Sequence, residues 1–170
     1  VLDKPGIRGT GGALLNAYEE GSLSPDEPII IHYGDIITDL DISDMIGFHR
    51  HAGAAVTVAL ARGYRLRVGV ADLDDDSRVK KFVEKPVLDV PVSIGVIVAE
   101  GVMYEVASRL VKENVSIDIM RDIIPALIEQ GHPVYGYVTD AFWYDLGSIE
   151  RFEKLSNSTI DDKLGFLLKP

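Results

Sequence analysis

The 170-residue sequence contains no cysteine and few basic residues, and each shortage excludes a class of protein. Without cysteine there is no disulfide, no thiolate zinc site and no cysteine nucleophile. Lys and Arg total 17 against 27 Asp and Glu, and a net charge of -10 argues against a general nucleic-acid binder. No apolar run approaches the length of a membrane span, and no basic segment precedes an apolar signal-like stretch. We therefore expect a cytoplasmic protein whose partners include neither nucleic acid nor membrane.

The pattern of apolar residues predicts strands that alternate with helices. Apolar residues make up 46% of the chain, and the continuous apolar run at 29–33 predicts a strand covered on both faces. Residues 42–52 predict a helix that Gly53 ends. Residues 65–86 predict a hairpin around an acidic turn, whereas the tail at 161–170 has no clear period. This alternation indicates an α/β fold with a mixed, mainly parallel sheet and flanking helices.

Glycines crowd the segment GIRGTGGALLNA, residues 6–17, just before a run of helix formers at 13–20. A dinucleotide-binding fingerprint needs a third glycine where Leu14 stands, and a phosphate-binding P-loop needs Gly-Lys-Ser/Thr where Gly12 is followed by alanine. Two interpretations stay open. The segment is a plain helix start, or its backbone amides approach a flat or anionic ligand.

Two aspartates follow apolar strands at distant points of the chain, Asp35 in IIIHYGDI and Asp145 in FWYDLGS. Open α/β sheets bind ligands beyond the carboxyl ends of their strands. Two such carboxylates could share one hard cation, because Mg²⁺ is usually held by one or two carboxylates together with substrate phosphates. Each aspartate could equally be an ordinary turn residue.

The segment FVEKP places Glu84 and Lys85 on opposite faces of a strand end. Lys85 could meet a phosphate and Glu84 could accept sugar hydroxyls, while the alternative is a solvated strand end. The acidic run at 72–76 lacks the glycine and the closing ligand of a calcium loop, so we interpret it as a hairpin tip.

Taken in order, six segments resemble the sugar-1-phosphate nucleotidyltransferases, namely GTGGALLNA, IIIHYGDIITDLDISDMIGFHRHAGAAVTVAL, VKKFVEKP, IGVIVAEGVMYEV, DIIPALIEQGHPVYGYV and FWYDLGSIERFEKL. That family includes the mannose-1-phosphate guanylyltransferases and the glucose-1-phosphate thymidylyltransferases. The resemblance covers residues 9 to about 156 and implies a Rossmann-like, glycosyltransferase-A-like fold. It also implies the reaction, in which a sugar 1-phosphate attacks the α-phosphate of a nucleoside triphosphate and pyrophosphate leaves, with Mg²⁺ as cofactor.

The resemblance also implies the site residues. The catalytic set would be Asp35, Lys85 and Asp145, with both aspartates as metal ligands and the lysine on the sugar phosphate. The substrate-binding set would be Thr10, Gly11 and Gly12 along the nucleobase, and Gly69, Glu84 and Gly95 around the sugar. One departure is that Ser93-Ile94-Gly95 stands where the family often has Asn-Ala-Gly.

The family's Gly-x-Gly-Thr-Arg-Leu loop and its downstream Lys-Pro, which bind the triphosphate, have no match in this sequence. We interpret residues 1–156 as the C-terminal portion of one catalytic domain and 157–170 as a tail, with the first strands of the sheet missing. The sheet would then have an open apolar edge, which predicts a homo-oligomer or a complementing N-terminal segment.

Three explanations remain for the lack of a triphosphate-binding loop in this sequence. The chain is a fragment of a longer enzyme, half of a split protein, or a natural remnant with another role. We favour the first, which predicts little activity for the chain alone. The alternatives in function are a non-catalytic regulatory subunit of the same fold and a metal- or sugar-phosphate-binding module.

Overall fold

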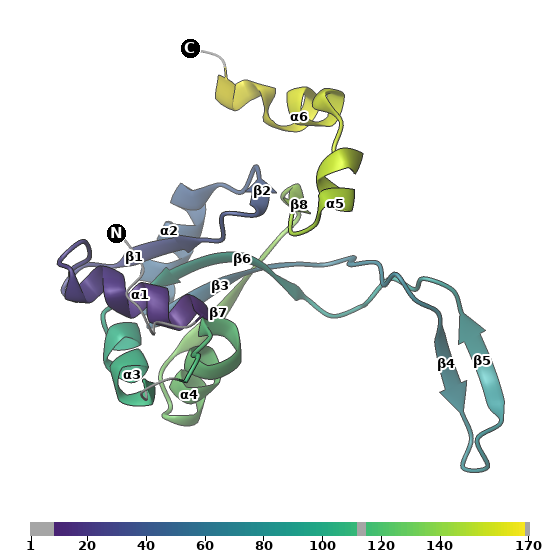
Figure 1. The fold of residues 1–170 in the computed structure, drawn as a ribbon, viewed down its shortest axis with the longest axis horizontal. Coiled ribbons are helices and arrows are strands. Elements are labelled where there is room, and N and C mark those ends of the chain that lie inside the picture. Colours follow the sequence, from purple (N-terminus) through teal and green to yellow (C-terminus); the bar gives the residue numbers. More distant parts are fainter. Residues whose placement is uncertain (1–8, 112–114, 169–170) are drawn as a thin grey trace.

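A four-stranded mixed sheet forms the centre of the protein in a computed structural model, which describes residues 9–111 and 115–168 (Figure 1). In spatial order its strands are β1 (Ile29–His32), β6 (Val92–Ala99), β3 (Val56–Ala61) and β7 (Val134–Thr139). Strand β6 is antiparallel to β1 and to β3, and β3 is parallel to β7. Three of the four strands therefore run in one direction, which confirms the predicted mixed sheet.

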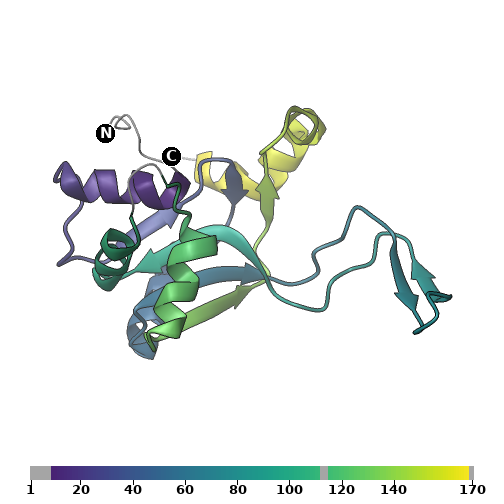
Figure 2. The same cartoon turned by 60° about the horizontal axis from the view of Figure 1, so that its bottom comes forward.

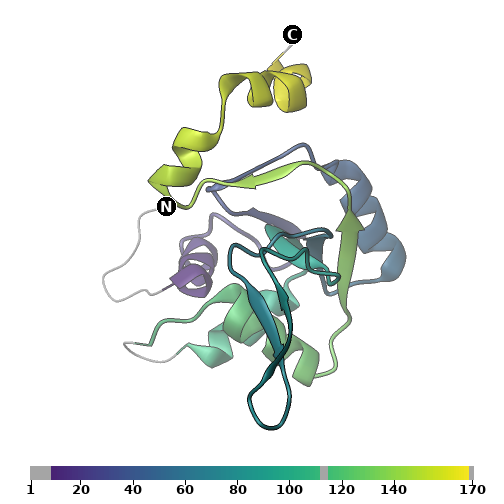
Figure 3. The same ribbon diagram turned by 90° about the vertical axis from the view of Figure 1, so that its right-hand side faces the viewer.

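Helices cover both faces of this sheet, and so its middle strands are mostly apolar, with Thr57 and Ser93 as exceptions. One face packs against α1 (Gly9–Glu19), α3 (Val102–Leu110), the π-helical turn η1 (Ile119–Ile123) and α4 (Ile124–Glu129). The other face packs against α2 (Ile42–Ala52), on the opposite side of the strands in Figure 3. Val56 and Val96, from β3 and β6, are fully buried on opposite faces.

Local sequence signals fix α2 at its predicted bounds. The Asp41 carboxylate caps the first turn by accepting from the Asp44 backbone N–H, and Gly53 ends the helix in the left-handed conformation with φ 58°. Helix α1 begins at Gly9, four residues earlier than the helix formers predict. The tail also differs from expectation: Ser156 caps α6 (Asn157–Leu164), and a 3₁₀ turn follows over Gly165–Leu168.

Two small sheets extend from the central one. Strand β2 (Ile36–Thr38) pairs with β8 (Trp143–Asp145), and α5 (Ile149–Lys154) follows directly. Strands β4 (Val70–Leu73) and β5 (Val79–Val83) form the predicted hairpin, an arm that projects away from the core in Figures 1 and 2. Every residue of its two strands is exposed. None of the helices in the described residues is long and apolar enough to cross a membrane.

Candidate active site

Asp35 and Asp145 are brought together by the pairing of β2 with β8. The antiparallel register sets Ile36 opposite Asp145, so Asp35, one residue before β2, lies beside the end of β8. The Leu146 backbone N–H donates to the Asp35 carbonyl at 2.7 Å and holds the two chain segments together. The structure therefore places the two aspartates close to each other.

The two carboxylates face a common point above Gly147. A Cβ atom on Gly147 would lie 2.8 Å from Asp145 Oδ1 and 3.2 Å from Asp35 Oδ2. The Gly147 backbone N–H donates to Asp145 Oδ1 at 2.7 Å. A side chain at this position would therefore fill the space that the two carboxylates enclose.

The charge on Asp145 is stabilised by its surroundings. The Gly147 N–H lowers the pKa of Asp145, and the Arg151 guanidinium, ion-paired with Asp145 Oδ2, and the charge of Arg67 lower that pKa further, against the opposing effect of burial. Asp145 is therefore a carboxylate anion at neutral pH, as a metal ligand has to be.

The donor set fits Mg²⁺. Within residues 9–111 and 115–168, no three His, Cys, Asp or Glu side chains gather closely enough to hold a metal ion by themselves. Asp35 and Asp145 supply a pair of hard oxygen ligands, which leaves the other positions of an octahedral ion to water and phosphate oxygens. Zinc sites, by contrast, usually have three or four protein ligands that include His or Cys.

A cavity of about 360 Å³ opens beside the two aspartates, and we call it the aspartate cavity. It is lined by Tyr33, Asp35, Ile36, Tyr64, Val92, Ser93, Ile94, Gly95, Met120, Trp143 and Asp145. Gly95 has φ +75°, and a Cβ there would lie 3.0 Å from Ile36 Cγ1 and 3.2 Å from Tyr33 Cβ. Both the backbone conformation and the close approach therefore require glycine at this wall.

Tyr33 contributes a phenol to the same cavity. Burial raises the pKa of Tyr33, the Thr10 hydroxyl lowers it, and the carboxylates of Asp118 and Asp35 raise it. The Tyr33 hydroxyl is buried. The neutral phenol is thus a polar group at the wall of the cavity that Asp35 and Asp145 also line.

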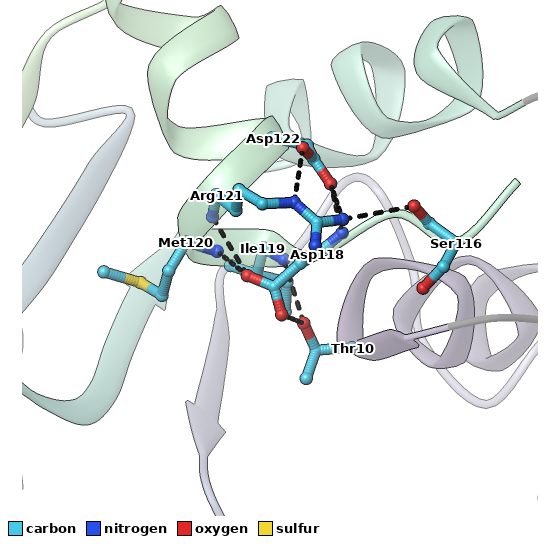
Figure 4. A network of polar contacts seen from close by, with 7 residues as sticks. All are labelled: Thr10, Ser116, Asp118, Ile119, Met120, Arg121 and Asp122. Carbon is cyan, nitrogen blue, oxygen red and sulfur yellow. Dashed lines mark hydrogen bonds and ion pairs between the residues drawn. The ribbon is translucent and has the colours of Figure 1, made fainter.

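The glycine-rich segment packs against a neighbouring part of the chain (Figure 4). The Thr10 hydroxyl donates to Asp118 Oδ2 at 2.9 Å and accepts from the Ile119 backbone N–H at 2.9 Å. The Gly11 N–H donates to the Ile117 carbonyl at 3.0 Å, and a Cβ on Gly11 would lie 2.9 Å from Ile123 Cδ1. Gly11 therefore allows α1 to approach η1 closely. This holds whether the segment is a plain helix start or also binds a ligand through its backbone. Gly12 is also buried.

Gly69, Glu84 and Lys85 lie together on the arm. A Cβ on Gly69 would meet the ring of Phe82 and lie 2.9 Å from Glu84 Oε2. Lys85 Nζ lies 3.8 Å from Glu84 Oε1, and both side chains are exposed. None of the three lines the aspartate cavity. The structure thus groups Asp35, Gly95 and Asp145, and it leaves the other sugar-site candidates on the arm.

Several residues at the site escaped the sequence analysis. Tyr64 and Trp143 stack with ring centroids 6.0 Å apart and form one wall of the aspartate cavity. Arg151 pairs with Asp145 from the helix that follows it. The available signal was a concentration of three arginines within 62–67 in an otherwise acidic chain.

Comparison with known proteins identifies the class. Residues 2–162 match the sequence profile of the family described as nucleotidyl transferase, and the chain belongs to that family. The structure is similar to that of HddC from Yersinia pseudotuberculosis, with a TM-score of 0.60 and 22% identity over 89% of this chain and 62% of that one. The fold is thus the glycosyltransferase-A-like fold of these enzymes.

Two relatives make the resemblance more specific. The chain is 31% identical over 160 residues to valienol-1-phosphate guanylyltransferase of Streptomyces hygroscopicus subsp. limoneus, covering 86% of this chain and 42% of that protein. It is 32% identical over 149 residues to mannose-1-phosphate guanylyltransferase of Mycobacterium tuberculosis, covering 85% of this chain and 39% of that protein. The chain thus spans about two fifths of the length of these relatives.

Proposed function

We propose that this protein takes part in nucleotide-sugar synthesis, the transfer of a nucleotidyl group from a nucleoside triphosphate to a sugar 1-phosphate with release of pyrophosphate. The observation that carries the proposal is the convergence of Asp35 and Asp145 on one cavity, in a chain of the nucleotidyl transferase family. A phosphate oxygen of the sugar 1-phosphate would form a new bond to the α-phosphorus. The bond from that phosphorus to the oxygen it shares with the β-phosphate would break, and pyrophosphate would carry the negative charge away.

Asp35 and Asp145 would hold Mg²⁺, which would neutralise charge on the phosphate oxygens when bound. Gly95 would leave room for the sugar at the cavity wall, and Gly69 and Glu84 would contact its hydroxyls. Lys85 would meet the sugar phosphate. These last three lie on the arm, so the proposal requires the arm to approach the aspartate cavity when substrate binds.

Thr10, Gly11 and Gly12 would contact the nucleobase. Because the Thr10 hydroxyl is already engaged with Asp118 and Ile119, its contact with a base would come from the backbone. Both relatives at 31% and 32% identity are guanylyltransferases, so GTP is the first nucleotide to test.

The test is pyrophosphate release from GTP and a panel of sugar 1-phosphates, with and without a polypeptide that supplies the family's triphosphate loop. Replacing a metal ligand by Asp35→Asn should lower turnover more than ~100-fold, because losing the metal's charge stabilisation costs several kcal/mol in the transition state. Asp162→Asn is the matched control, since that exposed side chain pairs only loosely with Lys163 at 3.9 Å. If the protein bound Mg²⁺ or a sugar 1-phosphate but released no pyrophosphate, with or without the loop-bearing polypeptide, the catalytic proposal would be contradicted. That result would support a metal- or sugar-phosphate-binding module.

We also propose a cytoplasmic location, where nucleoside triphosphates are available, and a partner strand on β1. Strand β1 pairs with β6 on one side only among the described strands, and Ile30 on it is 48% exposed. An open strand edge favours pairing with another chain. Cell fractionation and light scattering of the purified protein, alone and with the loop-bearing polypeptide, test these two points.

A further inference from the structure

A second cavity, of about 400 Å³, adjoins the aspartate cavity and shares Tyr64, Trp143 and Asp145 with it. Four of its lining residues are arginines, namely Arg62, Arg65, Arg67 and Arg151. We call it the arginine cavity. Among the residues that the structure describes, Asp145 is the only carboxylate in its lining.

This concentration of positive charge is only partly balanced, because the charge of Arg67 acts on Asp145 and on Glu150 without forming a close ion pair with either. Arg151 pairs with Asp145, but no carboxylate of the described residues lies within ion-pair distance of Arg62, Arg65 or Arg67. Like charges held close together repel, and here they gather in a chain whose net charge is -10. An anion bound in the cavity would relieve the remaining repulsion between the arginines.

Three of the four arginines come from residues 62–67, and backbone pairing with residues 86–88 holds that segment in place. The Leu66 N–H donates to the Pro86 carbonyl and the Leu88 N–H donates to the Tyr64 carbonyl, both at 2.8 Å. In such an extended pair alternate residues share a face, which places Arg65 and Arg67 together. Tyr64 stacks on Trp143, and α5 brings Arg151 to the same cavity.

We propose that the arginine cavity binds a phosphate group, which its guanidinium groups would hold through paired, charge-assisted hydrogen bonds. The inference rests on the proposed function only for the identity of the ligand. The phosphate group can come as a free anion, or as the second charged group of a sugar phosphate whose first phosphate lies in the aspartate cavity. The shared residues Tyr64, Trp143 and Asp145 would let one ligand reach both cavities.

Arg151 would couple this site to the metal site. It now pairs with Asp145, and a phosphate in the arginine cavity would compete for its guanidinium. Asp145 would then be released to bind Mg²⁺. Phosphate and Mg²⁺ should consequently strengthen each other's binding by the same factor.

The experiment is isothermal titration of the protein in EDTA at low salt with inorganic phosphate, glucose 1-phosphate and glucose 1,6-bisphosphate. The double variant Arg65→Gln/Arg67→Gln should weaken binding of at least one of these at least 10-fold. The matched control Arg78→Gln/Arg109→Gln removes the same charge from exposed positions outside the cavity and should change affinity less than twofold. A third variant, Arg65→Lys/Arg67→Lys, keeps the charge without the paired donors and should fall between the two.

Equal affinity for phosphate and for the bisphosphate would identify a free anion as the ligand. Tighter binding of the bisphosphate than of either other probe, with that advantage lost in the double glutamine variant, would identify a doubly charged substrate. No saturable binding of any probe, or equal weakening in the two glutamine variants, would overturn the proposal. Asp35→Asn separates the two hypotheses, because it should abolish metal-dependent turnover and leave phosphate binding in EDTA intact.

Discussion

Gly11 provides a sharp test of whether glycine at the start of α1 serves packing. Gly11→Ala adds one methyl group to a buried position, and that methyl would lie 2.9 Å from Ile123 Cδ1 and 3.1 Å from the Ile117 carbonyl oxygen. Both neighbours are confined, because Ile123 is fully buried and Ile117 is held by the hydrogen bond from Gly11 itself. Gly47→Ala is the matched control: Gly47 is an exposed residue within α2, and a Cβ there would meet nothing within 4 Å.

Both substitutions gain helix propensity, but only Gly11→Ala also forces a methyl group into a packed interior. Replacing glycine by alanine within a helix stabilises it by up to about 1 kcal/mol. Inserting a methyl group into a packed interior costs about 1–3 kcal/mol. We therefore expect Gly11→Ala to lower the free energy of unfolding by about 1 kcal/mol and Gly47→Ala to raise it by about 1 kcal/mol. For a chain of this size, each change corresponds to about 2–4 °C in melting temperature.

Urea denaturation followed by far-UV circular dichroism measures both changes. The informative quantity is the difference of about 2 kcal/mol between the variants, since helix propensity cancels from it. If Gly11→Ala stabilised the protein as much as Gly47→Ala does, the packing argument would be wrong. The requirement for glycine would then point to a ligand that approaches the backbone.

Three further predictions concern the site and its support. Thr10→Val should destabilise the protein by about 1–3 kcal/mol in urea titrations, because Asp118 and Ile119 lose a partner, whereas Thr10→Ser should be close to neutral. Arg151→Gln should raise Mg²⁺ affinity in the absence of phosphate, because it removes a cation that competes for Asp145; an unchanged titration would contradict that competition. The lowered pKa of Asp145 means that its ionised form stabilises the fold above about pH 4 and that this stabilisation is lost as pH falls through the folded-state pKa. The stability difference between the protein and Asp145→Asn should accordingly shrink on acidification below pH 4, and a difference that stays constant down to pH 2 would refute this.

The features predicted correctly from sequence are those with local causes. The bounds of α2 follow from an aspartate cap and a closing glycine, and the hairpin of the arm follows from two β-rich runs around an acidic turn. Helix α6 escaped prediction because its sequence is polar with little periodicity and its start depends on the Ser156 cap. The reversed direction of β6 depends on pairing with β1 and β3, which no local signal encodes.

The same distinction holds for the site. Asp35 and Asp145 could be anticipated, because each follows an apolar strand in a motif that resembles a known family. For the arginine cavity the sequence offers only the three arginines within 62–67, because the cavity itself also requires residues 64–66 to pair with 86–88 and α5 to return to that place. Lys85 differs from both of these groups. Resemblance to the nucleotidyltransferase family groups Lys85 with the two aspartates, whereas in the structure it lies on the arm, outside the aspartate cavity.

Direct titration with Mg²⁺ tests most simply whether Asp35 and Asp145 hold one metal ion between them. We expect one ion per chain, with affinity lowered at least about 10-fold by either Asp35→Asn or Asp145→Asn, because each removes half of the charge that holds the ion. Asp162→Asn should leave the titration unchanged. Equal Mg²⁺ binding by all four proteins, or a loss confined to one of the two site variants, would contradict a shared site.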